Sequence, residues 1–149
     1  MSTTLSSCLK SYYRIFGTAA TTVTSGVARN LFAEANFAQR NSQGTNITYD
    51  AVNNQIVFGN TGTRYFEVLF VGGIGASTGS QNGTVSIVID GVTQKSARGF
   101  STGTTNVARQ VTLYGIFSCT NGTTLQINYV GGTNVYITSG SSVIVRFIS

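Results

Sequence analysis

The sequence has no histidine, no proline and no tryptophan, and only two cysteines and four acidic residues in 149 positions. Without histidine, neither a Ser-His nor a Cys-His catalytic pair can form. One chain also cannot supply the four Cys and His ligands of a zinc site. Cys8 and Cys119 lie far apart and could pair only if the N-terminal segment folds back, so we favour two buried thiols.

The four acidic residues, Glu34, Asp50, Glu67 and Asp90, are isolated in the sequence. Glu67 and Asp90 could meet on adjacent strands, and paired carboxylates can hydrolyse glycosides. A structural interpretation is favoured, because Asp90 belongs to an Asp-Gly hairpin-turn signal and Glu67 lies in a strand where it could pair with an arginine. We therefore expect no enzyme activity, no catalytic residue, no metal site and no cofactor.

Charged residues make up 9% of the chain and hydrophobic residues 41%. Disorder requires high charge with low hydrophobicity, so we expect one folded domain with a sizeable core. The net charge of +5 comes from nine cations spread along the chain. This spread favours scattered surface charge over a nucleic-acid-binding face or attraction to an acidic surface such as another coat protein. No apolar run approaches the ~18 residues of a membrane span, and the start lacks the apolar centre of a signal peptide. We expect a soluble protein with no nucleic-acid or membrane partner.

The abundant polar residues favour strands and turns: Thr favours strands, and Asn and Gly favour turns. Alternating segments separated by turn signals predict about nine or ten strands, which indicates an all-β sandwich or jelly roll. Hairpin turns are expected at Asp90-Gly91 and Asn121-Gly122. The predicted strands cover residues 27–39, 47–52, 55–58, 64–71, 84–90, 92–97, 107–119, 125–129, 135–138 and 143–148, and the predicted polar loops cover 41–46, 72–83 and 98–106.

The segment 64–71 is the strongest strand candidate, and both of its faces are mostly apolar. Because side chains alternate along a strand, two apolar faces require two covers. One cover is the opposite sheet, and a neighbouring subunit is the simplest source of the other. The face assigned to the intramolecular core carries Phe66, Val68 and Phe70. The face expected to meet neighbouring subunits carries Tyr65, Glu67 and Leu69.

Residues 1–26 differ from the rest and are expected to form an N-terminal arm or anchor, with a jelly-roll domain over residues 27–149. Residues 8–16 could form a short helix or an extended anchor, because periodicity does not separate the two over so short a stretch. The arm could pack on its own domain or dock on a neighbouring protein. Its anchoring candidates are Tyr12, Tyr13 and Phe16.

Several segments in a fixed order carry a family resemblance. They are Asn-Gln-Ile-Val-Phe (54–58), Tyr-Phe-Glu-Val-Leu-Phe (65–70), Val-Ser-Ile-Val-Ile-Asp-Gly (85–91), the Asn-Gly hairpin and Ser-Val-Ile-Val-Arg-Phe (142–147). Over residues 47–149 the pattern resembles the tumour-necrosis-factor-like jelly roll, shared with the globular heads of complement collagen-like proteins. In texture it is closest to viral (phage) and spore-surface members, which are similarly rich in Thr, Gly and Asn. The chain lacks a Gly-X-Y stalk and a Phe-Gly pair near the C-terminus, which argues against a complement or cytokine role. The calcium sites of some members are unsupported by four isolated acids.

The resemblance implies a ten-stranded, two-sheet antiparallel jelly roll assembled as a tight homotrimer around a three-fold axis. The inner sheets of such trimers contribute aromatic and aliphatic side chains to the axis, for which Phe66 is an alternative to Tyr65. The trimer-interface candidates are Tyr65, Glu67, Leu69, Tyr114, Phe117 and Phe147.

Together these features predict a non-enzymatic viral structural protein located in the virion. It would be a trimeric capsid decoration or cement protein, head fibre or spike, docked through its arm on other capsid or fibre proteins. The alternative is a receptor- or carbohydrate-binding head of a phage fibre or of a cell- or spore-surface protein, with host attachment through a surface glycan. Loops 72–83, 98–106 and 131–134 are polar but offer one aromatic residue, Phe100, so solvated turns are favoured there.

Overall fold

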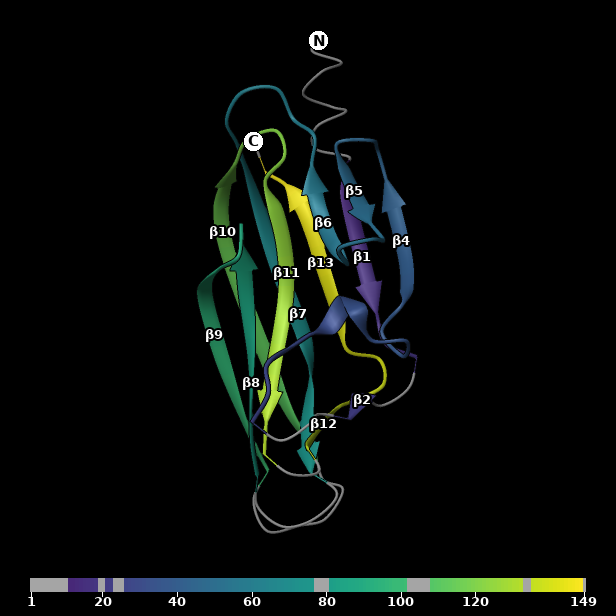
Figure 1. Ribbon diagram of the computed structural model, residues 1–149, viewed down its shortest axis with the longest axis vertical. Helices are drawn as coiled ribbons and strands as arrows, with labels where there is room; N and C mark the ends of the chain where they lie inside the picture. The colour runs from purple at the N-terminus through teal and green to yellow at the C-terminus, as the bar shows by residue number, and fades with distance from the viewer. Residues whose placement is uncertain are drawn as a thin grey trace.

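The computed structural model describes residues 11–18, 21–22, 26–76, 81–101, 108–132 and 135–148. Cys8, the side chain of Phe100 and the first ten residues of the expected arm lie outside the described part. The described residues form thirteen strands and one 3₁₀ helix, η1 (Leu31–Ala33). All strand pairs are antiparallel and belong to two facing sheets (Figure 1). This architecture confirms the all-β, two-sheet jelly-roll prediction.

Sheet A contains β1 (Tyr12–Phe16), β2 (Thr21–Thr22), β4 (Gln39–Gln43), β7 (Arg64–Ala76), β10 (Arg109–Cys119), β12 (Val135–Ile137) and β13 (Ser142–Phe147). Sheet B contains β3 (Arg29–Asn30), β5 (Ile47–Asp50), β6 (Gln55–Phe58), β8 (Gln81–Ile89), β9 (Val92–Ser101) and β11 (Thr124–Gly131). In sheet A, β7 pairs with β10 along one edge and with β13 and β12 along the other, and β1 lies between β13 and β4. The order in sheet B is β5-β6-β11-β8-β9, and β3 pairs with β11.

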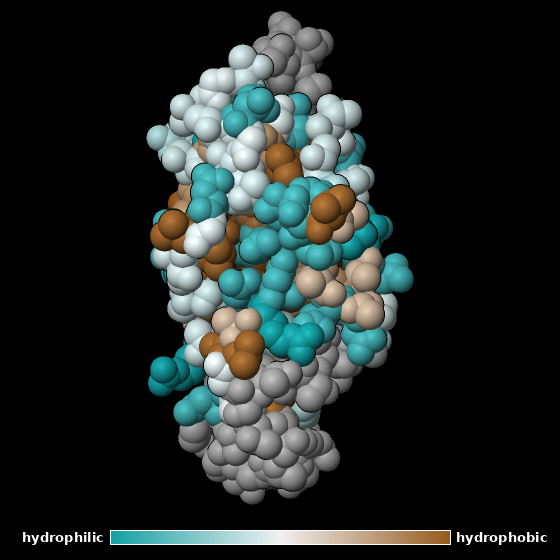
Figure 2. Space-filling model, in the orientation of Figure 1, coloured by the Kyte–Doolittle hydropathy of each residue, from teal (hydrophilic) through white to brown (hydrophobic). Residues whose placement is uncertain are grey.

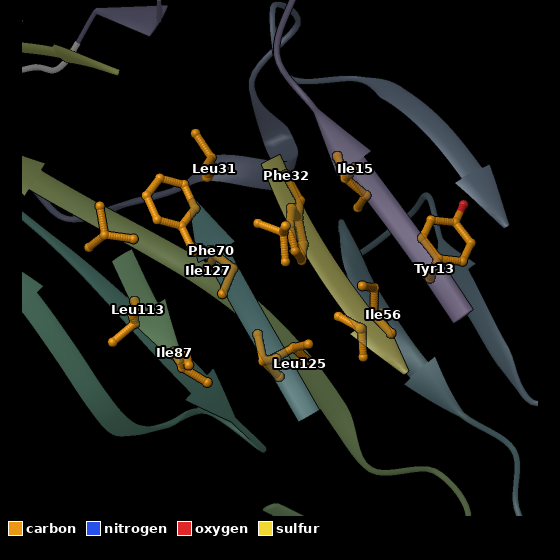
Figure 3. Packing of buried hydrophobic residues seen from close by; sticks show 14 of the residues in the cluster. Tyr13, Ile15, Leu31, Phe32, Ile56, Phe70, Ile87, Leu113, Leu125 and Ile127 are labelled. Carbon is orange, nitrogen blue, oxygen red and sulfur yellow. The ribbon is translucent and has the colours of Figure 1, made fainter. Parts of the chain in front are cut away.

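The inward side chains of the two sheets form one hydrophobic core. Figure 3 shows Phe70 and Leu113 of sheet A gathered with Ile87 and Ile127 of sheet B. Along β7, burial alternates, and the inward residues have no exposed surface: Phe66, Val68 and Phe70. Their assignment to the intramolecular core is confirmed.

Phe66 lies at an aromatic centre that connects the two sheets. Its ring centroid is 4.2 Å from that of Phe58 on β6 and 5.8 Å from that of Phe117 on β10. Fully burying such a side chain contributes about 1.5–3 kcal/mol, and each aromatic pair adds about 0.5–1.5 kcal/mol. Phe66 therefore holds the central strand of sheet A firmly against sheet B.

Both predicted hairpin turns are present. Asp90 and Gly91 have φ of 49° and 79°, which is the conformation of a type I′ turn. Gly122 has φ of 90°, and the Thr123 N–H donates to the Thr120 carbonyl oxygen at 3.1 Å. Glycine, with Asp or Asn before it, is the residue that accepts these left-handed backbone conformations.

The prediction of a long loop over residues 72–83 is wrong for residues 72–76 and 81–83, because β7 continues to Ala76 and β8 begins at Gln81. Residues 77–80 lie outside the described part of the chain. The glycines of this part of β7 make room for side chains of the crossing chain. A Cβ on Gly75 would lie 2.5 Å from the ring of Tyr136, and one on Gly73 would lie 2.8 Å from Thr138 Oγ1. Here glycine serves close approach within a strand and not a turn.

Two polar segments also differ from prediction. Residues 41–43 belong to the edge strand β4, which is exposed along its whole length. Neither face of β4 packs on the core, so the alternation that reveals a strand is missing. Residues 98–101 belong to β9, and the strand predicted over 27–39 is replaced by β3, η1 and the first residue of β4.

The boundary predicted at residue 26 is wrong for residues 12–16. These residues form β1, which pairs with β13 on one side and β4 on the other. Tyr13 and Ile15 are 9% and 1% exposed and belong to the core. Tyr13 therefore cannot anchor the chain to a neighbouring protein. Tyr12 and Phe16 are half-buried on the other side of the strand.

Candidate subunit interface

The side of sheet A that points away from the core is formed by alternate residues of β4, β1, β13, β7 and β10, and we call it outward face A. Residues paired directly across an antiparallel sheet point to the same side. The strand registers therefore arrange this face in rows. The first row is Gln43, Tyr12, Arg146, Glu67 and Ile116. The second row is Asn41, Arg14, Ile144, Leu69 and Tyr114. The third row is Gln39, Phe16, Ser142, Val71 and Thr112.

The β7 and β10 side of outward face A is rich in large apolar side chains. Tyr65, Tyr114, Ile116 and Ile148 are 51%, 41%, 52% and 36% exposed. Tyr65 and Ile148 are neighbours, because the Ile148 N–H donates to the Tyr65 carbonyl oxygen at 3.0 Å. Only three other large hydrophobic residues are exposed in the described part of the chain, and they lie outside sheet A. Exposed apolar residues gathered on one face are typical of surfaces that contact another molecule.

One polar cluster interrupts this apolar surface. Glu67 Oε1 accepts a hydrogen bond from Arg146 Nε, and Glu67 Oε2 accepts one from the Tyr114 hydroxyl at 2.7 Å. The Tyr114 hydrogen bond, followed by that of Arg146, lowers the pKa of Glu67, while partial burial acts in the opposite direction. The same hydrogen bond raises the pKa of Tyr114. The carboxylate therefore has its partners within its own chain, and covering this face would not leave Glu67 unpaired.

Arg14 is a second cation on outward face A, near its β4 edge. Its guanidinium carbon lies 4.7 Å from the ring centroid of Phe16. Its Nε is buried and has no hydrogen-bond partner among the described residues.

The structure separates the six interface candidates into two groups. Four lie on outward face A, where their cover by a neighbour stays a prediction: Tyr65, Glu67, Leu69 and Tyr114. The prediction that Phe117 and Phe147 lie at the interface is wrong, because both side chains point into the core. Phe147 is 1% exposed, and Phe117 packs against Phe66.

Sequence reasoning missed several residues of this face. Ile116, Ile144 and Ile148 were not among the candidates, although Ile116 alternates in phase with Tyr114. The same alternation makes Phe117 and Tyr114 point to different sides of β10, because the two residues are an odd number of positions apart. Tyr12 and Phe16, expected on a separate arm, also lie on this face.

The acidic residues are engaged within the chain and do not form a site together. Glu67 is in sheet A, whereas Asp90 lies in the β8–β9 turn of sheet B, where its Oδ1 accepts from the Thr124 N–H at 3.0 Å. The carboxylate pair considered for hydrolysis is therefore absent. Glu34 forms an ion pair with Arg29 at 2.8 Å. The described residues contain no group of three or more potential metal-ligating side chains.

Two further features could carry chemistry, namely a hollow beside outward face A and the thiol of Cys119. A hollow of about 330 Å³ continues outward face A beyond Val71, beside Gly73 and Gln110. The hydroxyls on its rim are used locally, since Ser139 Oγ donates to the Thr18 carbonyl and Ser141 Oγ accepts from the Gly73 N–H. Cys119 is buried, as predicted, and its thiol donates to Asn60 Oδ1 at 3.4 Å. No helix in the described ranges is long and apolar enough to cross a membrane.

Comparison with known proteins identifies the architecture. No protein-family model matches the chain, and no curated protein matches it. Among solved structures, murine APRIL superposes with a TM-score of 0.57 at 12% identity, over 91% of this chain and 96% of the other. The Eiger TNF of S. frugiperda gives 0.56 at 9% identity, over 93% and 92%. The globular domain of zebrafish complement 1qA gives 0.54 at 9% identity, over 94% and 98%.

The chain has the TNF-like jelly-roll fold. The resemblance drawn from residues 47–149 is confirmed at the level of the fold, and it extends to nearly the whole chain because β1 and β4 are part of sheet A. At 9–12% identity these likenesses show the fold alone. Closeness to viral and spore-surface members stays a prediction.

Proposed function

We propose that this TNF-like jelly roll is a non-enzymatic assembly protein that forms a homotrimer through outward face A. The observation that carries the proposal is the distribution of exposed apolar residues. Of the seven large hydrophobic residues exposed in the described part, four lie on this face or at its edge. Sheet A buries its other side in the core, and no described residue of the chain covers this face, so we assign its cover to a neighbouring subunit.

Strand β10 supports a three-fold arrangement. Among the described strands β10 forms ladder hydrogen bonds only with β7, and β9 of sheet B lies beside it, where Lys95 Nζ donates to the Tyr114 carbonyl oxygen. Strand β10 also carries Tyr114 and Ile116, the outermost apolar residues of outward face A. A contact between an edge and a face joins different surfaces of two copies, and such contacts form a closed ring when the rotation between copies is right. The trimer implied by the family resemblance is one such ring.

The finer role we propose is that of a virion component, a capsid decoration or cement protein, head fibre or spike. Its support is the charge-poor composition, the resemblance in texture to viral members and the absence of a carboxylate pair in the described site. Docking would use the residues that precede β1, because Tyr12, Tyr13 and Phe16 are part of sheet A. The alternative is a receptor-binding head on a fibre or surface.

Two measurements test these proposals in turn. Light scattering should give a mass near three times 15.7 kDa, and a monomer at micromolar concentration would contradict the trimer. For the virion role, the protein is mixed with empty capsids built from a major capsid protein encoded beside this gene. Cosedimentation and a raised capsid melting temperature are expected for a cement protein. Protein that ignores capsids but blocks infection when added free would instead favour the receptor-binding head.

A further inference from the structure

Glu67 is the one acidic side chain on outward face A. The chain has four acidic residues in all, and the structure describes each of them. Glu34 follows η1 and is ion-paired with Arg29. Asp50 ends strand β5 and Asp90 lies in the β8–β9 turn, so both belong to the side of sheet B. No other acidic side chain can therefore replace Glu67 on outward face A.

The cations of outward face A outnumber its single carboxylate. Arg146 is the direct neighbour of Glu67 on β13, and Arg14 lies on the next strand, β1. In the described part of the chain, two arginines and one ionised carboxylate give each copy of the face a net charge of +1. Protonation of Glu67 would raise this charge to +2, since both arginines keep theirs.

Among the described residues of this face, Glu67 alone changes its charge between neutral and acidic pH. The chain has no histidine, and tyrosine, lysine and arginine keep their protons throughout that range. The titratable or charged groups around Glu67 are Arg146 on β13, Tyr114 on β10, Tyr65 on β7 itself, Tyr12 and Arg14 on β1, and Lys95 on β9, whose Nζ donates to the Tyr114 carbonyl oxygen at 2.5 Å. Acid therefore acts on this face through one carboxylate.

Contact with a neighbouring subunit would change the surroundings of the pair formed by Glu67 and Arg146. In one chain the Glu67 side chain is 13% exposed, whereas that of Arg146 is 59% exposed. Covering the face would therefore remove mainly the arginine from water. While Glu67 is ionised, its Oε1 accepts from Arg146 Nε and balances the arginine charge. Once Glu67 is protonated, a covered Arg146 has lost its counter-charge, which strongly destabilises the covered state.

We propose that Glu67 makes the subunit contact acid-sensitive, so that its protonation releases folded subunits from the trimer. The inference rests on the proposed trimer through outward face A. A trimer contains three copies of the pair, so three carboxylates share in the release.

The direction of the pH dependence follows from the contacts of Glu67. Its hydrogen bonds with Tyr114 and Arg146 lower its pKa, while partial burial acts in the opposite direction. Association is therefore complete above the ordinary pKa of 4.5. It is lost as the pH falls through the lowered pKa, because the dissociated subunits then bind more protons than the trimer.

The test measures the mass of the full chain by light scattering between about pH 7 and about pH 3, with circular dichroism at each pH. Wild type should be trimeric at neutral pH and should dissociate into folded subunits in acid. Glu67→Gln imitates the protonated state, so its association at neutral pH should be weakened at least about tenfold.

Two further variants make the pH dependence specific to the pair. Arg146→Leu leaves the carboxylate without its cation, so its association should strengthen as the pH falls, opposite to wild type. Combining Glu67→Gln with Arg146→Leu keeps the net charge of the described face at +1 throughout, so association should respond little to pH. The control is Asp90→Asn on sheet B, and it should dissociate like wild type. The outer side of sheet B is mainly hydrophilic or neutral, and its hydrophobic residues lie apart from each other (Figure 2).

The outcomes separate this inference from the proposed trimer. Wild type that stays trimeric and folded throughout the acid range, or Arg146→Leu that follows the wild-type profile, would overturn the inference and leave the trimer standing. If acid unfolds the wild type before it dissociates, the neutral-pH comparison decides, and Glu67→Gln that is as tightly trimeric as wild type overturns the inference. A monomeric wild type at neutral pH would contradict the trimer itself.

Discussion

Replacing Leu69 with aspartate tests outward face A most directly, because the change leaves the core untouched. Leu69 lies between Ile144 on β13 and Tyr114 on β10 and is half-buried in a single chain. Full burial of a leucine side chain contributes about 1.5–3 kcal/mol, so covering its remaining surface contributes part of that amount. An aspartate there would also carry a desolvation penalty of several kcal/mol per charge.

Each subunit is thus expected to lose about 3 kcal/mol or more of contact free energy, which weakens association at least about a hundredfold. Light scattering should find wild type near three times 15.7 kDa and Leu69→Asp near 15.7 kDa, with an unchanged β-sheet circular dichroism spectrum. Thr48→Asp is the control, since Thr48 is exposed on β5 of sheet B, and it should stay trimeric. A folded Leu69→Asp protein that keeps the trimer mass would refute the reasoning.

The same strand offers a contrasting variant. Phe66 has no exposed surface and packs on Phe58 and Phe117. Phe66→Asp would bury an unpaired charge in the core, so we expect loss of the folded state itself. Both substitutions are severe, as the two apolar faces of 64–71 predict, but only the one at Leu69 should leave a folded monomer.

Three further predictions concern the fold and the polar cluster. Deleting residues 1–10 should leave a protein that is folded by circular dichroism. Deleting residues 1–26 should unfold it, because this deletion removes β1, which lies between β13 and β4. A folded 27–149 protein would contradict this placement. The hydrogen bonds from Tyr114 and Arg146 lower the pKa of Glu67 in the folded state. The Glu67 carboxylate therefore stabilises the fold fully at pH values above its ordinary pKa of 4.5. This contribution is lost as the pH falls through the lowered pKa. The urea midpoint should therefore fall less steeply with decreasing pH for Glu67→Gln than for wild type, and identical profiles would contradict the lowered pKa of Glu67. Some loss of stability in acid should remain in the variant, because hydrogen bonds from Asn53 also lower the pKa of Asp50. Gly131→Ala places a Cβ 2.8 Å from Val135 Cβ and should cost about 1–3 kcal/mol in urea unfolding, whereas Gly59→Ala, with its nearest atom at 3.9 Å, should be nearly neutral.

Alternation along single strands made much of the core predictable. The period of two holds along β13, where Val143, Val145 and Phe147 point inward and Ile144 and Arg146 point outward. The same rule placed Tyr65, Glu67 and Leu69 on one side of β7, and the pairing of β7 with β10 adds Tyr114 to that side. The interface candidates failed where residue type was used in place of phase, as with Phe117 and Phe147. An aromatic side chain suits a core and an interface equally well, so its type cannot distinguish them.

The all-β class, the two hairpin turns and the two faces of β7 follow from local sequence, because each depends on residues close together in the chain. The place of residues 12–16 in sheet A emerges only from the folded chain, because β1 pairs with β13 near the C-terminus and a short apolar segment does not reveal so distant a partner. The folded chain also decides that the glycines after Val71 continue a strand, since their role is set by Tyr136 and Thr138 on the crossing chain. Local polarity determines which side of a strand is buried, and long-range pairing determines which strands share a sheet and therefore which residues meet on its surface.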